Sequence, residues 1–230
     1  PALANTYQSS GQITVPSAQL LTTIASPSAG TSGDYSSASS VESLLPFVQA
    51  AADAGVSVQL SFQPRRATFL SQVLQYEELL EFPNVGVTLE PTWRVKPGGV
   101  PGVEAGSVSA AEINEVEVWL TQFGLERSLP PKFLVVQAPT SSSVTEPEAL
   151  ASSGPQVEVV IEIDGVGAVT PDPTQVVDPL APPIVTAASV WAAGTSTGWG
   201  EHWAWLQPST PIAPTELLGL DPVPVMITYR

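Results

Sequence analysis

The chain has no cysteine, a single histidine and only seven basic residues. Without cysteine it forms no disulfide, thiolate zinc site or iron–sulfur cluster, and it has no cysteine nucleophile. His202 is the only imidazole, and no G-x-S-x-G turn is present for a serine nucleophile. EF-hand and H-E-x-x-H spacings are absent as well. We therefore expect no metal and no cofactor, although Asp34, Glu90 and Asp164 would offer oxygen ligands to a hard cation.

Acidic residues dominate the charge, with 22 Asp and Glu against seven Lys and Arg, a net charge of −15. Such a surface repels nucleic acid and anionic membranes, so neither is an expected partner. No apolar segment approaches the length of a membrane span, and Pro1 is interpreted as the start of a mature or trimmed chain. The 24 prolines and two lysines are typical of a secreted or cell-surface protein; a cytosolic product of a GC-rich genome is the alternative.

Short apolar runs alternate with helical patterns along the chain. The runs predict strands near residues 18–25, 56–62, 85–89, 133–136, 157–163, 199–206 and 223–229. Capping-box pairs start helices at Ser39 and Ser109, and a further helix is predicted over 67–82. The alternation predicts an α/β fold, a (β/α) TIM-type barrel with about seven clear strands, irregular or incomplete around 168–183. Residues 1–16 are expected to form an extended arm and 17–230 a single barrel domain. The alternative is an open, doubly wound sheet, whose usual glycine fingerprint is missing.

Polar side chains follow several of these strands. The strand at 85–89 runs into Glu90, Pro91 and Trp93, and Pro91 should end it because proline donates no ladder hydrogen bond. In such barrels the site lies at the carboxyl ends of the strands. The residues expected there are Asp34, Gln63, Glu90, Trp93, Gln137, Asp164, Trp205, Gln207 and Tyr229.

Two carboxylates, several amides and tryptophans suit a sugar, because amides bind hydroxyls and indoles cover a pyranose ring. Glycoside hydrolysis needs a pair of carboxylates, for which Glu90 and Asp164 are the candidates, with Glu90 beside Trp93 as the acid. The remaining seven residues would contact the substrate. They are Asp34, Gln63, Trp93, Gln137, Trp205, Gln207 and Tyr229.

Each of these residues can also have a purely structural role. Glu90 can accept backbone N–H groups, Asp164 before Gly165 is a common turn pair, and Gln63 and Gln137 can satisfy buried backbone. Arg65 and Arg66 would pair with nearby acids. The tryptophans at 199, 203 and 205 fall on one strand face and can form core or a ligand platform, whereas His202 points the other way.

Several segments, in order, are similar to a family of secreted proteins and lipoproteins from actinobacteria with a glycosidase-like barrel. They are GDYSS at 33–37, LSFQPRRATFL at 60–70, YEELL at 76–80, VGVTLEPTWRVKPGGVPG at 85–102, GSVSAAEINEVEVWL at 106–120, LPPKFLVVQ at 129–137, IDGVG at 163–167 and PTELLGLDPVPVMITY at 214–229. The resemblance implies a barrel over about 20–230, with no established activity to carry over. Where this chain has Glu90 and Thr92, the family has Asp and Glu. The family also commonly has a histidine at the position of Val136 and an acidic tail at the positions of residues 206–209. This chain resembles a divergent member.

Two functions remain open from the sequence. The first is a secreted glycosidase-like barrel that acts on or binds an extracellular or envelope polysaccharide. The second is a non-catalytic surface or structural domain on the same scaffold, which binds a protein partner or self-assembles; the missing family acids favour it. Fold by itself does not distinguish them.

Overall fold

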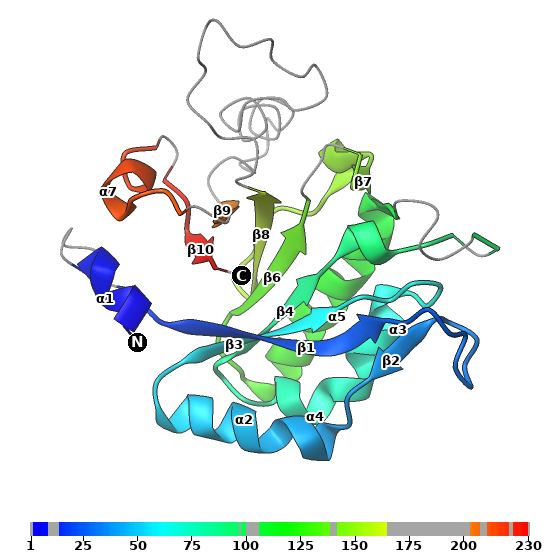
Figure 1. Cartoon of the computed structure of the whole chain (residues 1–230). Coiled ribbons are helices and arrows are strands. Elements are labelled where there is room, and N and C mark those ends of the chain that lie inside the picture. Colours follow the sequence, from blue (N-terminus) through cyan, green and yellow to red (C-terminus); the bar gives the residue numbers. More distant parts are fainter. Residues whose placement is uncertain are drawn as a thin grey trace, which may run out of the picture.

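The fold is seen in a computed structural model that describes residues 2–8, 14–96, 98–99, 106–138, 142–164, 203–207, 211–220 and 223–229. Its centre is a sheet of eight strands in the order β10-β9-β8-β6-β4-β3-β1-β2 (Figure 1). The strands are β1 (Ser17–Ala25), β2 (Ser36–Ala38), β3 (Ser57–Phe62), β4 (Val85–Leu89), β6 (Lys132–Gln137), β8 (Val157–Asp164), β9 (Trp203–Leu206) and β10 (Met226–Thr228). A separate two-stranded sheet joins β5 (Val108–Ser109) to β7 (Val144–Thr145).

The sheet is a mixed half-barrel, and the prediction of a closed TIM-type barrel is wrong. Each predicted strand has a counterpart, and seven strands run parallel in chain order. The outer side of β1, however, pairs with the antiparallel β2, while β10 forms the other edge of the described sheet. Alternating strands and helices specify parallel crossovers, but closure depends on strand number, tilt and shear, which are not local properties. The irregular region expected at 168–183 lies outside the described residues.

The helices cover one face of the sheet (Figure 1). Strands that advance in one direction through connections of one hand place their helices on the same side. The helices are α2 (Val41–Asp53), α3 (Phe69–Val73), α4 (Glu77–Leu80) and α5 (Ala110–Arg127), with single turns η1 (Leu74–Tyr76), η2 (Pro91–Trp93) and η3 (Pro147–Ala149). The helix predicted over 67–82 is thus divided into α3, η1 and α4. Among the described helices, none is long and apolar enough to cross a membrane.

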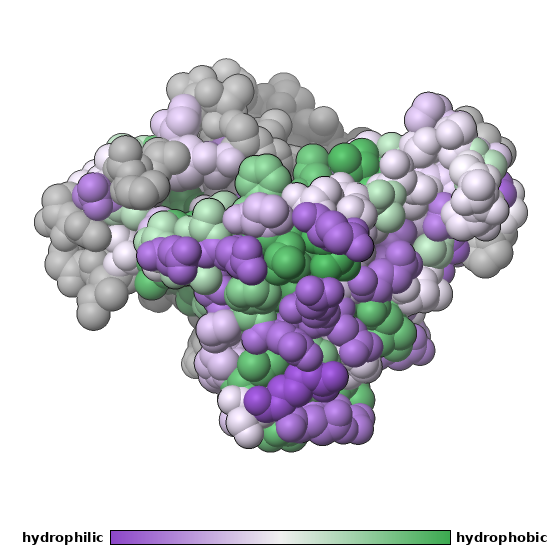
Figure 2. Space-filling view, turned by 90° about the horizontal axis from the view of Figure 1, so that it is seen from below, coloured by the Kyte–Doolittle hydropathy of each residue, from purple (hydrophilic) through white to green (hydrophobic). Residues whose placement is uncertain are grey.

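The main hydrophobic core lies between the sheet and these helices. Alternate strand residues such as Leu60, Val87, Leu134 and Ile161 point into it, because successive side chains on a strand face opposite ways. Seen from below, the side on which α2 and α4 lie in Figure 1, the outer surface mixes hydrophilic and hydrophobic residues (Figure 2). The core therefore accounts for one face of the sheet, and a smaller buried cluster of Val135, Val160 and Ala204 lies on the other.

The two ends of the described chain meet beyond the edge of the sheet. Helix α1 (Ala2–Gln8) occupies part of the segment expected to be extended, and α7 (Pro214–Leu217) precedes β10. The hydroxyl groups of Tyr7 and Tyr229 are hydrogen-bonded to each other. Burial, together with this contact, raises the pKa of Tyr7 to about 12. The N-terminal segment is thus attached to the last strand.

Lys132 is a buried cation at the start of β6. It is 2% exposed, and its Nζ donates to the carbonyl oxygens of Phe82 at 3.1 Å and Val85 at 3.0 Å. Burial lowers its pKa from 10.5 to about 8, because removal from water penalises the charged form. The two carbonyls bind the ammonium group but do not offset this cost.

Lys132 should make the free energy of unfolding vary with pH in the alkaline range. Between pH 8 and pH 10 the unfolded lysine holds its proton while the folded lysine loses it, so the free energy of unfolding should rise with pH. Each pKa unit is worth about 1.4 kcal/mol. Above pH 10 the trend should reverse, because burial raises the pKa of Tyr7 and Tyr76 to about 12 and the folded state then binds more protons.

Urea denaturation at a series of pH values measures this effect. We expect a maximum near pH 10 for the natural protein and a flatter rise for Lys132→Met, which cannot titrate. A stability that falls continuously from pH 8 would contradict the assignment to Lys132.

Candidate functional site

Glu90 is the centre of a buried polar cluster at the carboxyl ends of β3 and β4. It follows β4 directly, because Pro91 begins the turn η2, and it is 4% exposed. One carboxylate oxygen accepts from Ser61 Oγ, and the other accepts from Gln63 Nε2 at 3.0 Å and Trp93 Nε1 at 3.0 Å. The expected neighbours Gln63 and Trp93 are therefore brought to Glu90, and within the described part of the chain its donors are side chains, not backbone N–H groups.

The cluster continues along the uncovered face of the sheet, by which we mean the face opposite to α2, α3, α4 and α5. Ser61 accepts from Gln19 Nε2 at 2.8 Å, so a chain of hydrogen bonds runs from β1 to Glu90. The ladder pairs Leu89 with Val136 and Gln137 with Glu162. Glu90, Gln137 and Glu162 thus form one row across β4, β6 and β8, opposite to the core side chains. We call these three residues the carboxylate row.

Glu162 was not predicted as a site residue. It is 3% exposed and accepts a hydrogen bond from Thr228 Oγ1. Gln59, Ser61 and Thr88 on the same face were missed as well. The signal was present in the sequence, since each is a polar residue at an alternate position of an apolar strand, as in VSVQLSF and VEVVIEI. These residues lie within the strands and not at their ends.

A hollow of about 1020 Å³ lies on this uncovered face, toward the amino ends of the strands. Gln19, Gln59, Thr88 and Glu162 contribute polar lining, and Phe133 contributes an apolar wall. The amide of Gln59 is buried without a hydrogen-bond partner in the described residues, and it lies over Gly86. A Cβ at Gly86 would come within 2.8 Å of both amide atoms. Glycine at this position therefore makes room for the side chain.

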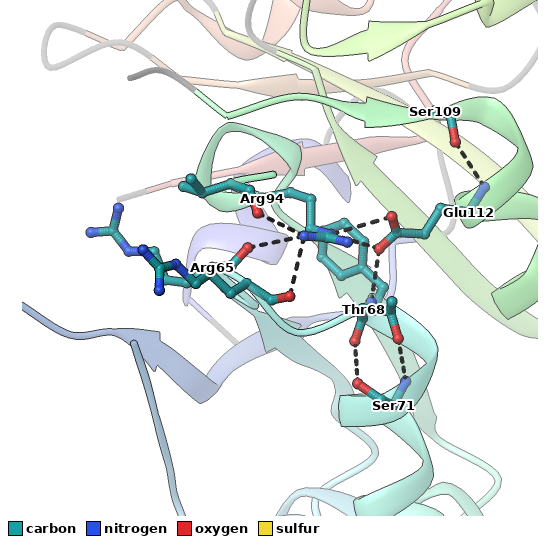
Figure 3. A network of polar contacts seen from close by, with 9 residues as sticks. Arg65, Thr68, Ser71, Arg94, Ser109 and Glu112 are labelled. Carbon is teal, nitrogen blue, oxygen red and sulfur yellow. Dashed lines mark hydrogen bonds and ion pairs between the residues drawn. The ribbon is translucent and has the colours of Figure 1, made fainter. Parts of the chain in front are cut away.

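A buried ion pair holds the loop that carries Trp93. Arg94 Nε lies 2.8 Å from a Glu112 carboxylate oxygen, and Figure 3 shows the two groups facing each other. The same carboxylate accepts from Phe69 N at 3.1 Å. Ser109 caps α5 by accepting from Glu112 N, as predicted, but the Glu112 side chain turns to Arg94. This pair connects the loop after β4 with the first turns of α3 and α5.

A second group of expected site residues lies near β9 and β10. Gln207 Nε2 donates to Ile212 O at 3.0 Å and lies 3.5 Å from Tyr229 Oη. Its oxygen accepts from Ile212 N at 2.9 Å and Trp205 Nε1 at 3.3 Å. Through these contacts Gln207 links Trp205 on β9 to Ile212, which precedes α7.

The tryptophans of β9 belong to the core. Trp205 is 1% exposed and meets Trp203 edge-to-face, with ring centroids 6.1 Å apart. Both pack in the helix-covered core, so Trp205 is not part of the uncovered face. Trp191, Trp199 and His202 lie outside the described residues.

The other expected residues have separate positions. Asp34 Oδ1 accepts from Ser36 N at 2.9 Å, which shapes the turn before β2. Asp164 ends β8, where its backbone pairs with Leu206, and its side chain is outside the described part. Among the described residues, no three His, Asp or Glu side chains gather in a way that could hold a metal ion.

A comparison with protein-family models found no match, and no curated protein compared with the chain is similar to it. The resemblance to an actinobacterial barrel family stays a prediction.

Proposed function

We propose that this protein binds a carbohydrate, as part of an extracellular or cell-envelope polysaccharide, on the uncovered face of its half-barrel sheet. The observation that carries the proposal is the carboxylate row, Glu90, Gln137 and Glu162, which lies in register on three neighbouring strands. Gln63 and Trp93 border the row through their hydrogen bonds to Glu90.

The chemistry of this face suits a polyhydroxylated ligand. Carboxylates accept hydrogen bonds from sugar hydroxyls, and amides both donate and accept them. The adjoining hollow of about 1020 Å³ is at the upper end of the usual range for ligand pockets, so it has room for several sugar units. The helices α2, α3, α4 and α5 lie on the opposite face (Figure 1).

Glycoside hydrolysis is the second candidate function, and Glu90 favours it. The amide of Gln63 and the indole of Trp93 both donate to Glu90 Oε2, and donors of this kind favour the carboxylate form. That arrangement suits an acceptor, a base or a nucleophile better than the general acid expected from the sequence. If the protein hydrolyses glycosides, Asp164 would be the general acid.

Binding is tested with immobilised oligosaccharides followed by calorimetry on those retained. Glu162→Gln and Glu90→Gln should each lower the affinity about tenfold or more, because each replaces a hydrogen-bond acceptor oxygen with an amide NH₂ that can only donate. Glu115→Gln, on the exposed side of α5, is the matched control and should bind as the natural protein does. Equal binding by all four proteins would refute a site on this face.

Turnover is tested by the release of reducing ends from the retained sugars. If the protein hydrolyses them, Glu90→Gln should lower the rate about a hundredfold or more, since a catalytic carboxylate contributes at least that much. Binding without any release would leave carbohydrate binding as the function and remove hydrolysis. Full activity in Glu90→Gln would remove Glu90 from the mechanism.

A further inference from the structure

Two neighbouring arginines, Arg65 and Arg66, have no carboxylate partner among the described residues. This is unusual in a chain with 22 acidic and seven basic residues. Arg94 pairs with Glu112, and Arg127 lies near three glutamates. The sequence-based expectation that Arg65 and Arg66 pair with nearby acids is therefore wrong for the described part of the chain.

Arg65 lies beside the Glu90 cluster. Its guanidinium stacks over the Trp93 ring, 4.8 Å from the centroid, and the indole N–H of the same ring binds Glu90. The residue is 8% exposed, and its Nε is buried without a hydrogen-bond partner among the described residues. Nε is therefore a buried donor of the guanidinium that no described residue satisfies.

The backbone conformation fixes the position of Arg65. Arg65 has a φ of 53°, in the left-handed region, where a non-glycine residue is strained. Its carbonyl oxygen accepts from Val95 N at 2.7 Å and from Arg94 Nη1 at 3.3 Å. These contacts hold the strained turn, and the ion pair of Arg94 anchors them to α5. Arg65 is therefore positioned before any ligand arrives.

Arg66 lies next to it with a similar arrangement. Its guanidinium stacks over Tyr35, 4.6 Å from the ring centroid, and donates to Gly99 O at 2.7 Å. A buried guanidinium without a counter-charge is costly. Stacking on an aromatic ring satisfies a face of the group, but it leaves the N–H donors in its plane available. Those donors match the two oxygens of a carboxylate or sulfate.

We propose that Arg65, assisted by Arg66, binds an oxyanion of the sugar, a carboxylate or a sulfate ester, so that the ligand is an acidic carbohydrate. This inference rests on the proposed carbohydrate binding and specifies its substrate class. The net charge of −15 repels anionic polymers in general. Binding of an acidic sugar must therefore come from a local site such as this one.

The test compares neutral, uronic-acid and sulfated oligosaccharides of equal length on the natural protein and on Arg65→Gln, Arg65→Lys and Arg66→Gln. Arg127→Gln is the control, because Arg127 lies on α5 among glutamates. The natural protein should bind at least one acidic sugar about tenfold or more tightly than its neutral counterpart. Arg65→Gln should abolish the preference, and Arg127→Gln should keep it. Circular dichroism and thermal unfolding verify that each variant is folded.

Arg65→Lys keeps the charge but not the planar fork, so it should retain only part of the preference. The uronic and sulfated arms identify which oxyanion is bound. If neutral and acidic sugars bind equally, or if Arg65→Gln and Arg66→Gln keep the preference, the inference is overturned while carbohydrate binding stands. If no sugar binds, the proposed function falls and the inference with it.

Discussion

Replacing Arg94 with methionine should lower the free energy of unfolding by about 3 to 5 kcal/mol, the usual cost of breaking a buried ion pair from one side. The side chains of Arg94 and Glu112 are only 10% and 17% exposed. Without Arg94, Glu112 keeps a buried charge with one remaining donor, Phe69 N. The carbonyls of Arg65 and Val95 also lose a donor. The penalty therefore comes from unpaired groups more than from lost attraction.

Urea denaturation followed by circular dichroism measures this loss. Arg127→Met is the matched control, because Arg127 pairs with glutamates on an exposed surface, where an ion pair contributes at most about 1 kcal/mol. A double variant with Glu112→Gln should cost less than the sum of the single changes, since it removes the uncompensated charge. A loss below 1 kcal/mol for Arg94→Met would show that the loop after β4 is held by other contacts.

Replacing Trp205 with alanine should cost about 3 to 5 kcal/mol, as expected for removing a large aromatic side chain from a packed core. Trp205 is 1% exposed and loses its edge-to-face contact with Trp203 on substitution. Its bond to Gln207 disappears as well. The surrounding strands cannot fill the space left, so a cavity adds to the lost burial.

This variant also separates two interpretations of the tryptophans. A core residue affects stability first, whereas a ligand platform affects binding with little change in stability. Phe47→Ala is the control, because Phe47 is 63% exposed on α2 and should change the free energy of unfolding by less than about 1 kcal/mol. A stable Trp205→Ala protein that no longer binds carbohydrate would overturn the assignment to the core.

Much of the local structure follows from the sequence. Val85, Val87 and Leu89 predict a buried strand, and Pro91 ends it as expected. Ser109 begins α5, because a serine side chain accepts an N–H that the helix cannot satisfy itself. The position of Glu90 at a strand end was also predictable, since it depends only on that strand and its terminator.

Contacts between distant segments were not predictable. In the described sheet the antiparallel β2 pairs with the outer side of β1, although the alternation of strands and helices is the same as in a barrel. Arg94 meets Glu112 across 18 residues, and Glu162 falls in register with Gln137 only through the ladder. A sequence specifies which face each side chain takes, because that depends on local periodicity. Which carboxylates and cations share a face depends on strand order and register, which only the tertiary structure decides.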